Sequence, residues 1–319
     1  MAGMKVRPPF PWPPDKAQLL HRADRLEWAT LFFMSTVVVV MWLAQGSSQA
    51  MRSAWIEDVL SLVPATTYLI ARRFEERPPD HRFPFGYYNA IPLAYLVSAT
   101  TILIFAGYMI YSSGKELLSD DHPSIGLVSV FGNDVWMGWV MMAALLYSVI
   151  PPMVLGAMKT PVAEELHDKV LIADAAMQRA DWKTGLAALA GVAGVGFGLW
   201  WADAVAALII AVDVLNDGRR HVLAALRDLA DEIPMTFKDR DEDPVTEEVR
   251  AAVLALDWVA EAEVALRDEG HPVSGTIYIR PKEPEPWVER LRDACNAAHA
   301  ADWRTYDLNV VVLPPEPRS

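Results

Sequence analysis

The stretch Trp28–Ala44, WATLFFMSTVVVVMWLA, decides the fold class, because it is long and apolar enough to cross a bilayer. Five further apolar segments pass the same length test of about 20 residues. The predicted spans cover roughly residues 28–45, 50–71, 90–113, 133–158, 168–198 and 201–226. The sequence therefore predicts an α-helical membrane protein with six transmembrane helices.

The composition supports a membrane domain followed by an acidic soluble one. The 319 residues are 53% hydrophobic, which exceeds the apolar share of an ordinary soluble domain. The net charge is −13, and the acidic excess lies after about residue 228. This acidity argues against nucleic acid as a partner. The single cysteine, Cys295, excludes a disulfide framework and a thiolate metal cluster.

The last 75 residues predict a small α+β module. Hydrophobic periodicity and turn residues place a helix over 246–256, strands over 259–268 and 274–281, a helix over 285–300 and a strand over 306–314. The order αββαβ predicts a two-layer, ferredoxin-like fold with both helices on one face of the sheet. We divide the chain into a cytoplasmic N-terminal segment (1–26), a transmembrane domain (27–230), a charged linker (231–244) and a cytoplasmic dimerisation domain (245–319).

Basic residues concentrate in alternate loops and predict the orientation. They are Arg72, Arg73, Arg77 and Arg82 after the second span, Lys159 and Lys169 after the fourth, and Arg219 and Arg220 at the end of the sixth. By the positive-inside rule both termini are cytoplasmic. The composition and this pattern suggest a bacterial inner membrane.

Four motifs, in order along the chain, resemble the cation diffusion facilitator family. RPPDHRFPFGYYNA (Arg77–Ala90) looks like the family's PD-x-x-H-P-[YF]-G-H-x-K/R loop, and WWADAVAALIIAVDVLNDG (Trp200–Gly218) is similar to its sixth span. AWIED (Ala54–Asp58) and MQRAD (Met177–Asp181) fall where the second and fifth spans carry D/H-x-x-x-D and H-x-x-x-D. The resemblance implies a homodimer that exchanges a cytoplasmic divalent metal ion for protons and needs no cofactor.

The resemblance places four metal-ligand positions at Ala54, Asp58, Met177 and Asp181. Residues at i and i+4 share one helix face, so two helices can offer four ligands to one ion. Ala54 has no ligand atom, and Met177 offers a thioether or merely packs between helices. Two carboxylates with one thioether make a poor zinc site.

Other oxygen donors lie near these positions. Asp174, Gln178 and Asp181 fall on one face of the fifth predicted span, and Glu57 adjoins Asp58 but is rotated by about 100°. An oxygen-rich site of Asp58, Asp181 and either Gln178 or Asp174 suits Mn(II), Mg(II) or Fe(II) better than Zn(II). Asp174 could instead capture ions at the cytoplasmic entrance or cap local polar groups.

Asp58 and Asp181 could instead have a purely structural role. Arg52, Arg179 or Lys183 could neutralise Asp58 or Asp181 in a buried pair with no ion. If a metal binds, however, proton coupling follows, because two close carboxylates in a low dielectric cannot both stay ionised without a cation.

The accessory metal sites of the resembling family are mostly missing. Asp80 remains in the loop motif, but Phe83 and Tyr87 stand where the family has His. The last predicted strand has no ligand, and His271 and His299 are interpreted as surface residues. We therefore expect the C-terminal module to dimerise without metal.

The preferred hypothesis is a proton-linked divalent-cation efflux antiporter with an altered, oxygen-rich site. The alternative is a non-transporting scaffold or regulatory member of the family whose ion site has decayed, as the loss of a ligand at Ala54 suggests. The chain has no HExxH, GxSxG or nucleotide-binding loop, so an enzyme is not expected.

Overall fold

The chain forms two compact units. The computed structural model describes residues 10–44, 49–118, 127–130, 133–196, 201–236, 241–282 and 287–314. The helical unit contains Gln18–Ala71 and Ala94–Ala225. The C-terminal unit joins Leu226–Ser319 with Met1–Ala17 and Arg72–Leu93. The C-terminal unit thus includes the loop that follows the second predicted span.

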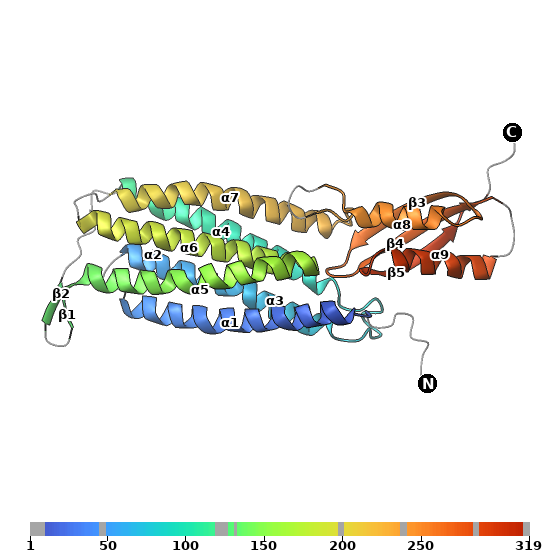
Figure 1. Ribbon diagram of the computed structural model, residues 1–319. Coiled ribbons are helices and arrows are strands. Elements are labelled where there is room, and N and C mark those ends of the chain that lie inside the picture. Colours follow the sequence, from blue (N-terminus) through green and yellow to red (C-terminus); the bar gives the residue numbers. More distant parts are fainter. Residues whose placement is uncertain are drawn as a thin grey trace. The chain divides into compact units, whose positions relative to one another are not determined.

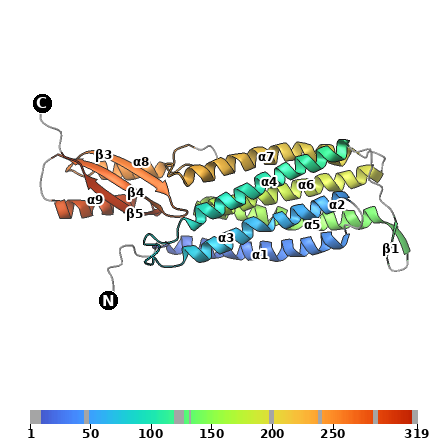
Figure 2. The ribbon, with the colours of Figure 1, turned by 180° about the vertical axis from the view of Figure 1, so that it is seen from behind.

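Long helices run side by side through the helical unit (Figures 1 and 2). They are α1 (Pro14–Ala44), α2 (Gln49–Leu60), α3 (Leu62–Glu75), α4 (Ala90–Leu118), α5 (Met137–Leu166), α6 (Lys169–Gly196) and α7 (Ala202–Asp228). Helices α5 and α6 pack against each other and are joined by a tight turn at His167, which has a left-handed φ of 55°.

Of the described helices, α1, α4 and α5 are both long and apolar enough to cross a membrane. Six spans are therefore not confirmed. The second predicted span is divided at Ser61, three residues before Pro64, which cannot donate a hydrogen bond to the carbonyl of Leu60. Helices α6 and α7 are long enough to cross a membrane, but charged residues reach further into them than into α1, α4 and α5.

The prediction of a span beginning at residue 133 was wrong in its first turn. Residues Asn133–Trp136 form strand β2, which pairs antiparallel with β1 (Leu127–Val130) in a short hairpin before α5. Lys159, predicted to lie in a loop, is instead inside α5 and completely buried.

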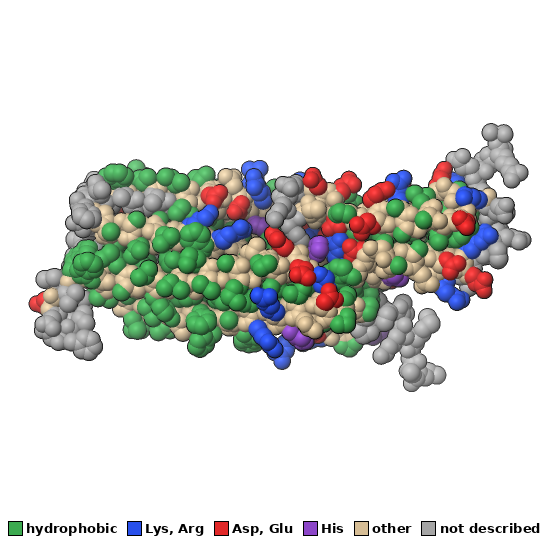
Figure 3. All heavy atoms as spheres, viewed as in Figure 1, with side chains coloured by type: hydrophobic (Ala, Val, Ile, Leu, Met, Phe, Trp, Pro, Cys, Tyr) green, Lys and Arg blue, Asp and Glu red, His purple; other side chains and the backbone are tan. Residues whose placement is uncertain are grey.

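Large apolar side chains cover much of the outside of the helical unit (Figure 3). Exposed examples are Trp28, Phe32, Leu43, Ile104, Tyr111 and Ile209. An apolar surface of this extent is unfavourable in water and suits contact with lipid hydrocarbon. On the face shown, acidic and basic side chains gather mainly over the C-terminal unit.

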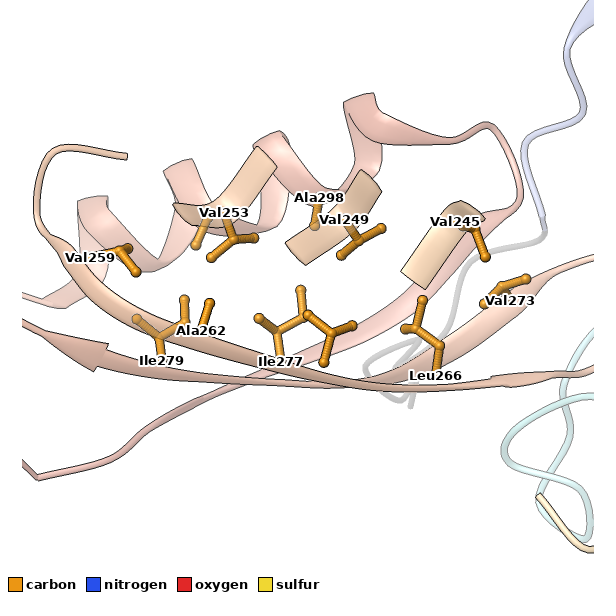
Figure 4. Packing of buried hydrophobic residues seen from close by; sticks show 12 residues of the cluster. Val245, Val249, Val253, Val259, Ala262, Leu266, Val273, Ile277, Ile279 and Ala298 are labelled. Carbon is orange, nitrogen blue, oxygen red and sulfur yellow. The ribbon is translucent and has the colours of Figure 1, made fainter. Parts of the chain in front are cut away.

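The C-terminal module has the predicted αββαβ order. It consists of α8 (Pro244–Leu254), β3 (Val259–Asp268), β4 (Val273–Pro281), α9 (Trp287–Ala301) and β5 (Thr305–Val312). Strand β4 is central, antiparallel to β3 and parallel to β5. Both helices cover one face of the sheet (Figure 4).

The core of the module follows from two periodicities. Val245, Val249 and Val253 recur every four residues on one face of α8, and Ile277 and Ile279 alternate on the inner face of β4. All five side chains are buried and pack in one cluster (Figure 4). These two periodicities therefore account for the side chains that α8 and β4 bury between them.

A buried ionic contact joins the end of α3 to the turn between β3 and β4. The Nδ1 atom of His271 lies 2.9 Å from Oε1 of Glu75, and Arg72 pairs with the other oxygen of Glu75. Burial alone would raise the pKa of Glu75, but the charges of His271 and Arg72 and the hydrogen bonds from them outweigh it and lower the pKa below its ordinary value. His271 is 1% exposed, so the prediction of a surface histidine was wrong.

An aromatic cluster draws three distant segments together within the C-terminal unit. Phe10, Tyr88 and Tyr306 are buried against one another. The backbone N–H of Phe10 donates to the hydroxyl of Tyr88 at 3.1 Å, and that hydroxyl donates to the hydroxyl of Tyr306 at 3.5 Å. The N-terminal segment is thus anchored to the loop before α4 and to strand β5.

Candidate metal site

A small polar cavity lies inside the helical unit. Its volume is about 30 Å³, which is room for one or two water-sized groups. Four helices supply its walls. The lining residues are Met41 of α1, Glu57 and Asp58 of α2, Leu145 and Ser148 of α5, and Asp181, Thr184, Gly185 and Ala188 of α6.

The cavity brings together the two carboxylates that the sequence singled out. Asp58 lies in the last turn of α2 and Asp181 in the middle of α6, and both side chains are buried. Oδ2 of Asp58 and both carboxylate oxygens of Asp181 lack a hydrogen-bond partner among the described residues. Ser61 lies near Asp181, but its hydroxyl donates to the backbone carbonyl of Asp58 at 2.8 Å. Unpaired buried carboxylates are costly, which makes them candidates for a bound cation.

The structural alternative of a buried ion pair is not found within the part of the chain that the structure describes. Lys183 turns outward to Asp213, with Nζ 3.3 Å from Oδ2. Arg179 is exposed on α6. The side chain of Arg52 lies outside the described residues. Neither cavity carboxylate therefore has a described basic partner.

The hydroxyl groups of Ser148 and Thr184 also line the cavity and were not predicted from the sequence. Ser148 donates to the carbonyl of Leu145 at 2.8 Å, and Thr184 donates to the carbonyls of Ala180 and Asp181 at 3.0 and 2.9 Å. Because their hydrogens are used in this way, the hydroxyls can offer only oxygen lone pairs to a cation. The signal in the sequence was a small polar residue on each of two helices that pack closely.

The structure places the predicted ligands Glu57 and Met177 differently relative to the cavity. Glu57 lines the cavity beside Asp58 despite the 100° rotation between neighbours. Met177 is completely buried but is not part of the cavity wall, and Met41 supplies the sulfur there instead. Ala54 lies in α2, and its side chain is outside the described residues.

Asp174 and Gln178 face a different group of side chains. Asp174 pairs with the buried Lys159, and Nζ of the same lysine lies 3.0 Å from Oε1 of Glu27. Gln178 donates to Oδ2 of Asp174 at 3.0 Å and to the Thr30 hydroxyl at 3.3 Å. We call Glu27, Lys159 and Asp174 the lysine cluster. Neither the role of Glu27 nor the burial of Lys159 was predicted from the sequence.

The donor set limits what the cavity could hold. Within the described ranges, no group of three or more His, Cys, Asp or Glu side chains is placed to bind a metal ion. A cation beside Asp58 and Asp181 would thus complete its coordination with neutral oxygens and water. Such a set is typical of ions that accept oxygen ligands and retain water.

Asp80, the remnant of the accessory motif, organises its own loop. It accepts hydrogen bonds from the hydroxyl of Tyr87 at 2.6 Å and from the backbone N–H groups of Phe83 and Arg82 at 2.8 and 2.7 Å. These hydrogen bonds lower the pKa of Asp80, and the bond from Tyr87 has the largest effect. Tyr87 thus uses the carboxylate that a metal would need.

Comparison with known proteins gives distant relatives. The chain is 19% identical over 165 residues to the manganese efflux system protein MneS of Bacillus subtilis, covering 52% of this chain and 53% of that protein. It is 25% identical over 189 residues to the cation-efflux pump FieF of Shewanella oneidensis, with 59% and 60% covered. It is also 25% identical over 162 residues to the magnetosome protein MamB of Magnetospirillum gryphiswaldense, with 51% and 50% covered.

The matches span about half to three fifths of the length of these relatives. Residues 27–230, well over half of the chain, match the cation efflux transmembrane domain. These residues contain Asp58, Asp181 and the whole cavity wall. The chain therefore belongs to the cation efflux family, whose members are transporters.

Proposed function

We propose that the chain moves a divalent cation out of the cytoplasm in exchange for protons, and that the ion binds at the cavity between Asp58 and Asp181. One observation carries the proposal. Two buried carboxylates, without a described basic partner, converge from two helices on a cavity large enough for an ion. An intramembrane acid is expensive to retain, so its presence favours a functional role.

The chemistry of the wall favours Mn(II), Fe(II) or Mg(II) over Zn(II). Carboxylate and hydroxyl oxygens are the ligands that these harder ions accept, whereas Zn(II) prefers nitrogen and sulfur. Met41 is the single sulfur-bearing side chain among the lining residues. The relative MneS, named as a manganese efflux system protein, is consistent with this preference.

In this proposal Asp58 and Asp181 are the main ligands, and Glu57 draws the cation toward them. Ser148 and Thr184 add neutral oxygens. We assign Met177 to packing, because it is buried away from the cavity wall. Asp174 and Gln178, predicted as ligands or as an entrance, act through the lysine cluster described above.

Exchange with protons follows from charge. When the ion leaves, two carboxylates remain close together inside the bundle, and they cannot both stay ionised there. A proton enters as the metal departs, and the next metal ion expels it. Transport should therefore acidify the side from which the metal is taken.

The proposed architecture retains six membrane crossings. Helices α2 and α3 together form the second, and α6 and α7 form the last two. The transmembrane domain covers 27–230, the linker 231–244 and the dimerisation domain 245–319, with the termini, including segment 1–26, in the cytoplasm. We place the protein in a bacterial inner membrane. It is a homodimer associated through the C-terminal module, where Tyr278 and Val311 are exposed neighbours on the outer sheet face.

The test is reconstitution in liposomes that contain a pH-sensitive dye. Mn(II), Fe(II), Zn(II), Co(II), Cd(II) and Mg(II) are added one at a time to the wild type, to Asp58→Asn and to Asp213→Asn. Asp213 is a matched control, because it is an exposed acid of α7 that pairs with Lys183 outside the cavity. We expect proton movement with Mn(II) that Asp58→Asn abolishes and Asp213→Asn preserves.

Two results would contradict the proposal. A folded wild type that moves no protons with any of the six ions favours a scaffold or regulatory role. A wild type that transports while Asp58→Asn transports equally well places the ion elsewhere. A preference for Zn(II) over Mn(II) would refute only the inference about ion type.

A further inference from the structure

Two acids and one base of the lysine cluster are completely enclosed by protein. Glu27 comes from α1, Lys159 from α5 and Asp174 from α6, and each is 0% exposed. The ammonium group of Lys159 contacts both carboxylates. Charges in such surroundings need compensation for the water that they have lost.

The formal charges of the cluster do not balance. Two carboxylates and one ammonium sum to −2 + 1 = −1. The other described contacts of the cluster are neutral, since Gln178 donates to Asp174 and to Thr30. No second described lysine or arginine pairs with Glu27 or Asp174. One positive charge is missing.

The geometry identifies that charge. Glu27 and Asp174 contact the same ammonium group, that of Lys159, so their carboxyl groups lie close together. Both carboxylate oxygens of Glu27, Oδ1 of Asp174 and Oε1 of Gln178 are buried and make no hydrogen bond to the part of the chain that the structure describes. An excess negative charge is costly in a fully buried site, and a carboxylate loses its charge when it takes up a proton. A metal ion fits poorly here, because the ammonium already occupies the space between the acids and repels a second cation.

We propose that Glu27, Asp174 and Lys159 form a proton-binding site, separate from the metal cavity, which holds one proton on one of its two carboxyl groups. The described charged groups that face this proton are those three side chains, one each from α1, α5 and α6. Protonation makes the cluster neutral overall, with Lys159 balancing the remaining carboxylate.

The position of the cluster links it to the cavity. Asp174 and Asp181 are seven residues apart on α6, which is about 10 Å along the helix axis. Both side chains are buried between the helices, where their interaction is screened much less than at the surface. A divalent cation bound at Asp181 therefore repels the proton of the cluster and promotes its release. This coupling rests on the proposed function, whereas the proton site itself does not.

The proton site is tested on the purified full chain in the absence of metal. Infrared absorption of protonated carboxyl groups is compared between the wild type, Glu27→Gln, Asp174→Asn and the control Asp213→Asn at neutral pH. We expect the control to keep the whole band of buried protonated carboxyl groups. Both cluster variants should lose the share of one carboxyl group and keep the share of the Asp58–Asp181 pair. A wild type without such a band overturns the proposal, even if neither variant folds, and so does a band unchanged in both variants.

The coupling is tested by titrating Mn(II) into the same proteins. Calorimetry in two buffers of different ionisation enthalpy counts the protons released per ion. We expect Glu27→Gln to bind Mn(II) and to release one proton fewer than the wild type. Equal release refutes the coupling. If the wild type does not bind Mn(II), the proposed metal site fails for that ion, while the infrared result for the proton site stands.

Discussion

Replacement of Lys159 by methionine tests the lysine cluster as a source of stability. Methionine matches the length and volume of the lysine stem but removes the charge that both Glu27 and Asp174 contact. Removal of one partner from a buried ion pair costs about 3–5 kcal/mol, because the remaining charge is left without compensation. We expect the free energy of unfolding of Lys159→Met to fall by that amount at neutral pH.

The loss should be reversible by neutralising the acids. The triple variant with Glu27→Gln and Asp174→Asn contains no buried charge in the cluster, and such replacements of buried ion pairs are often neutral or stabilising. We expect it to recover at least about 2 kcal/mol relative to Lys159→Met. At acidic pH the single variant should also recover, because its carboxylates take up protons.

The assay is unfolding in mixed detergent micelles, followed by tryptophan fluorescence, for which the chain has 12 reporters. The control is Lys183→Met, whose ion pair with Asp213 is largely exposed at 42% and 66%. Such a pair is worth about 0–1 kcal/mol. The reasoning is refuted if Lys159→Met loses no more stability than this control, or if the triple variant is no more stable than the single one.

Three further predictions follow from individual contacts. Gly185→Ala places a methyl group at the cavity wall, 2.6 Å from Cγ2 of Val149. The affinity for Mn(II), measured by calorimetry, should therefore fall while helix content is retained. Unchanged affinity would exclude an ion next to Gly185. Gly275→Ala would overlap the backbone carbonyl of Ala265 in β3 and should destabilise the C-terminal module by at least about 1–3 kcal/mol, visible as a lower unfolding midpoint. Because the pKa of Glu75 lies below its ordinary value of 4.5, the stabilisation from its carboxylate is lost as the pH falls through the folded-state value. The stability difference between wild type and Glu75→Gln should therefore disappear in acid, and a difference that grows in acid would contradict this assignment.

The parts of the fold with strong local patterns were predictable. Strand β3 alternates buried and exposed residues, and the predicted bounds 259–268 agree with the observed Val259–Asp268. The division of the second span was not predicted, although Pro64 is a local signal for a break in hydrogen bonding near Ser61. The placing of Asp58 and Asp181 at one site was implied by the resemblance of two short motifs to the cation diffusion facilitator family. Each of these signals is contained in a short window of sequence.

Contacts between distant residues were not predictable. Lys159 stands at the end of an apolar run, so it resembled a basic loop residue, and its partner Glu27 is 132 positions earlier. His271 follows a glycine and precedes a proline, which is typical of an exposed turn, but its partner Glu75 is 196 residues away. No local pattern indicates such pairs, since the cost of burial is offset only by a side chain elsewhere in the chain.

The hydrogen bonds that join Phe10, Tyr88 and Tyr306 have a consequence for biosynthesis. Tyr306 lies 218 residues after Tyr88, and a ribosome adds about 5–20 residues each second, so the loop waits roughly 10–45 s for its partner. Throughout that interval the ring of Phe10 lacks its contact with the ring of Tyr306. Docking of this N-terminal aromatic is therefore among the last events of assembly, and a nascent chain halted before Tyr306 leaves Phe10 accessible to chaperones and proteases.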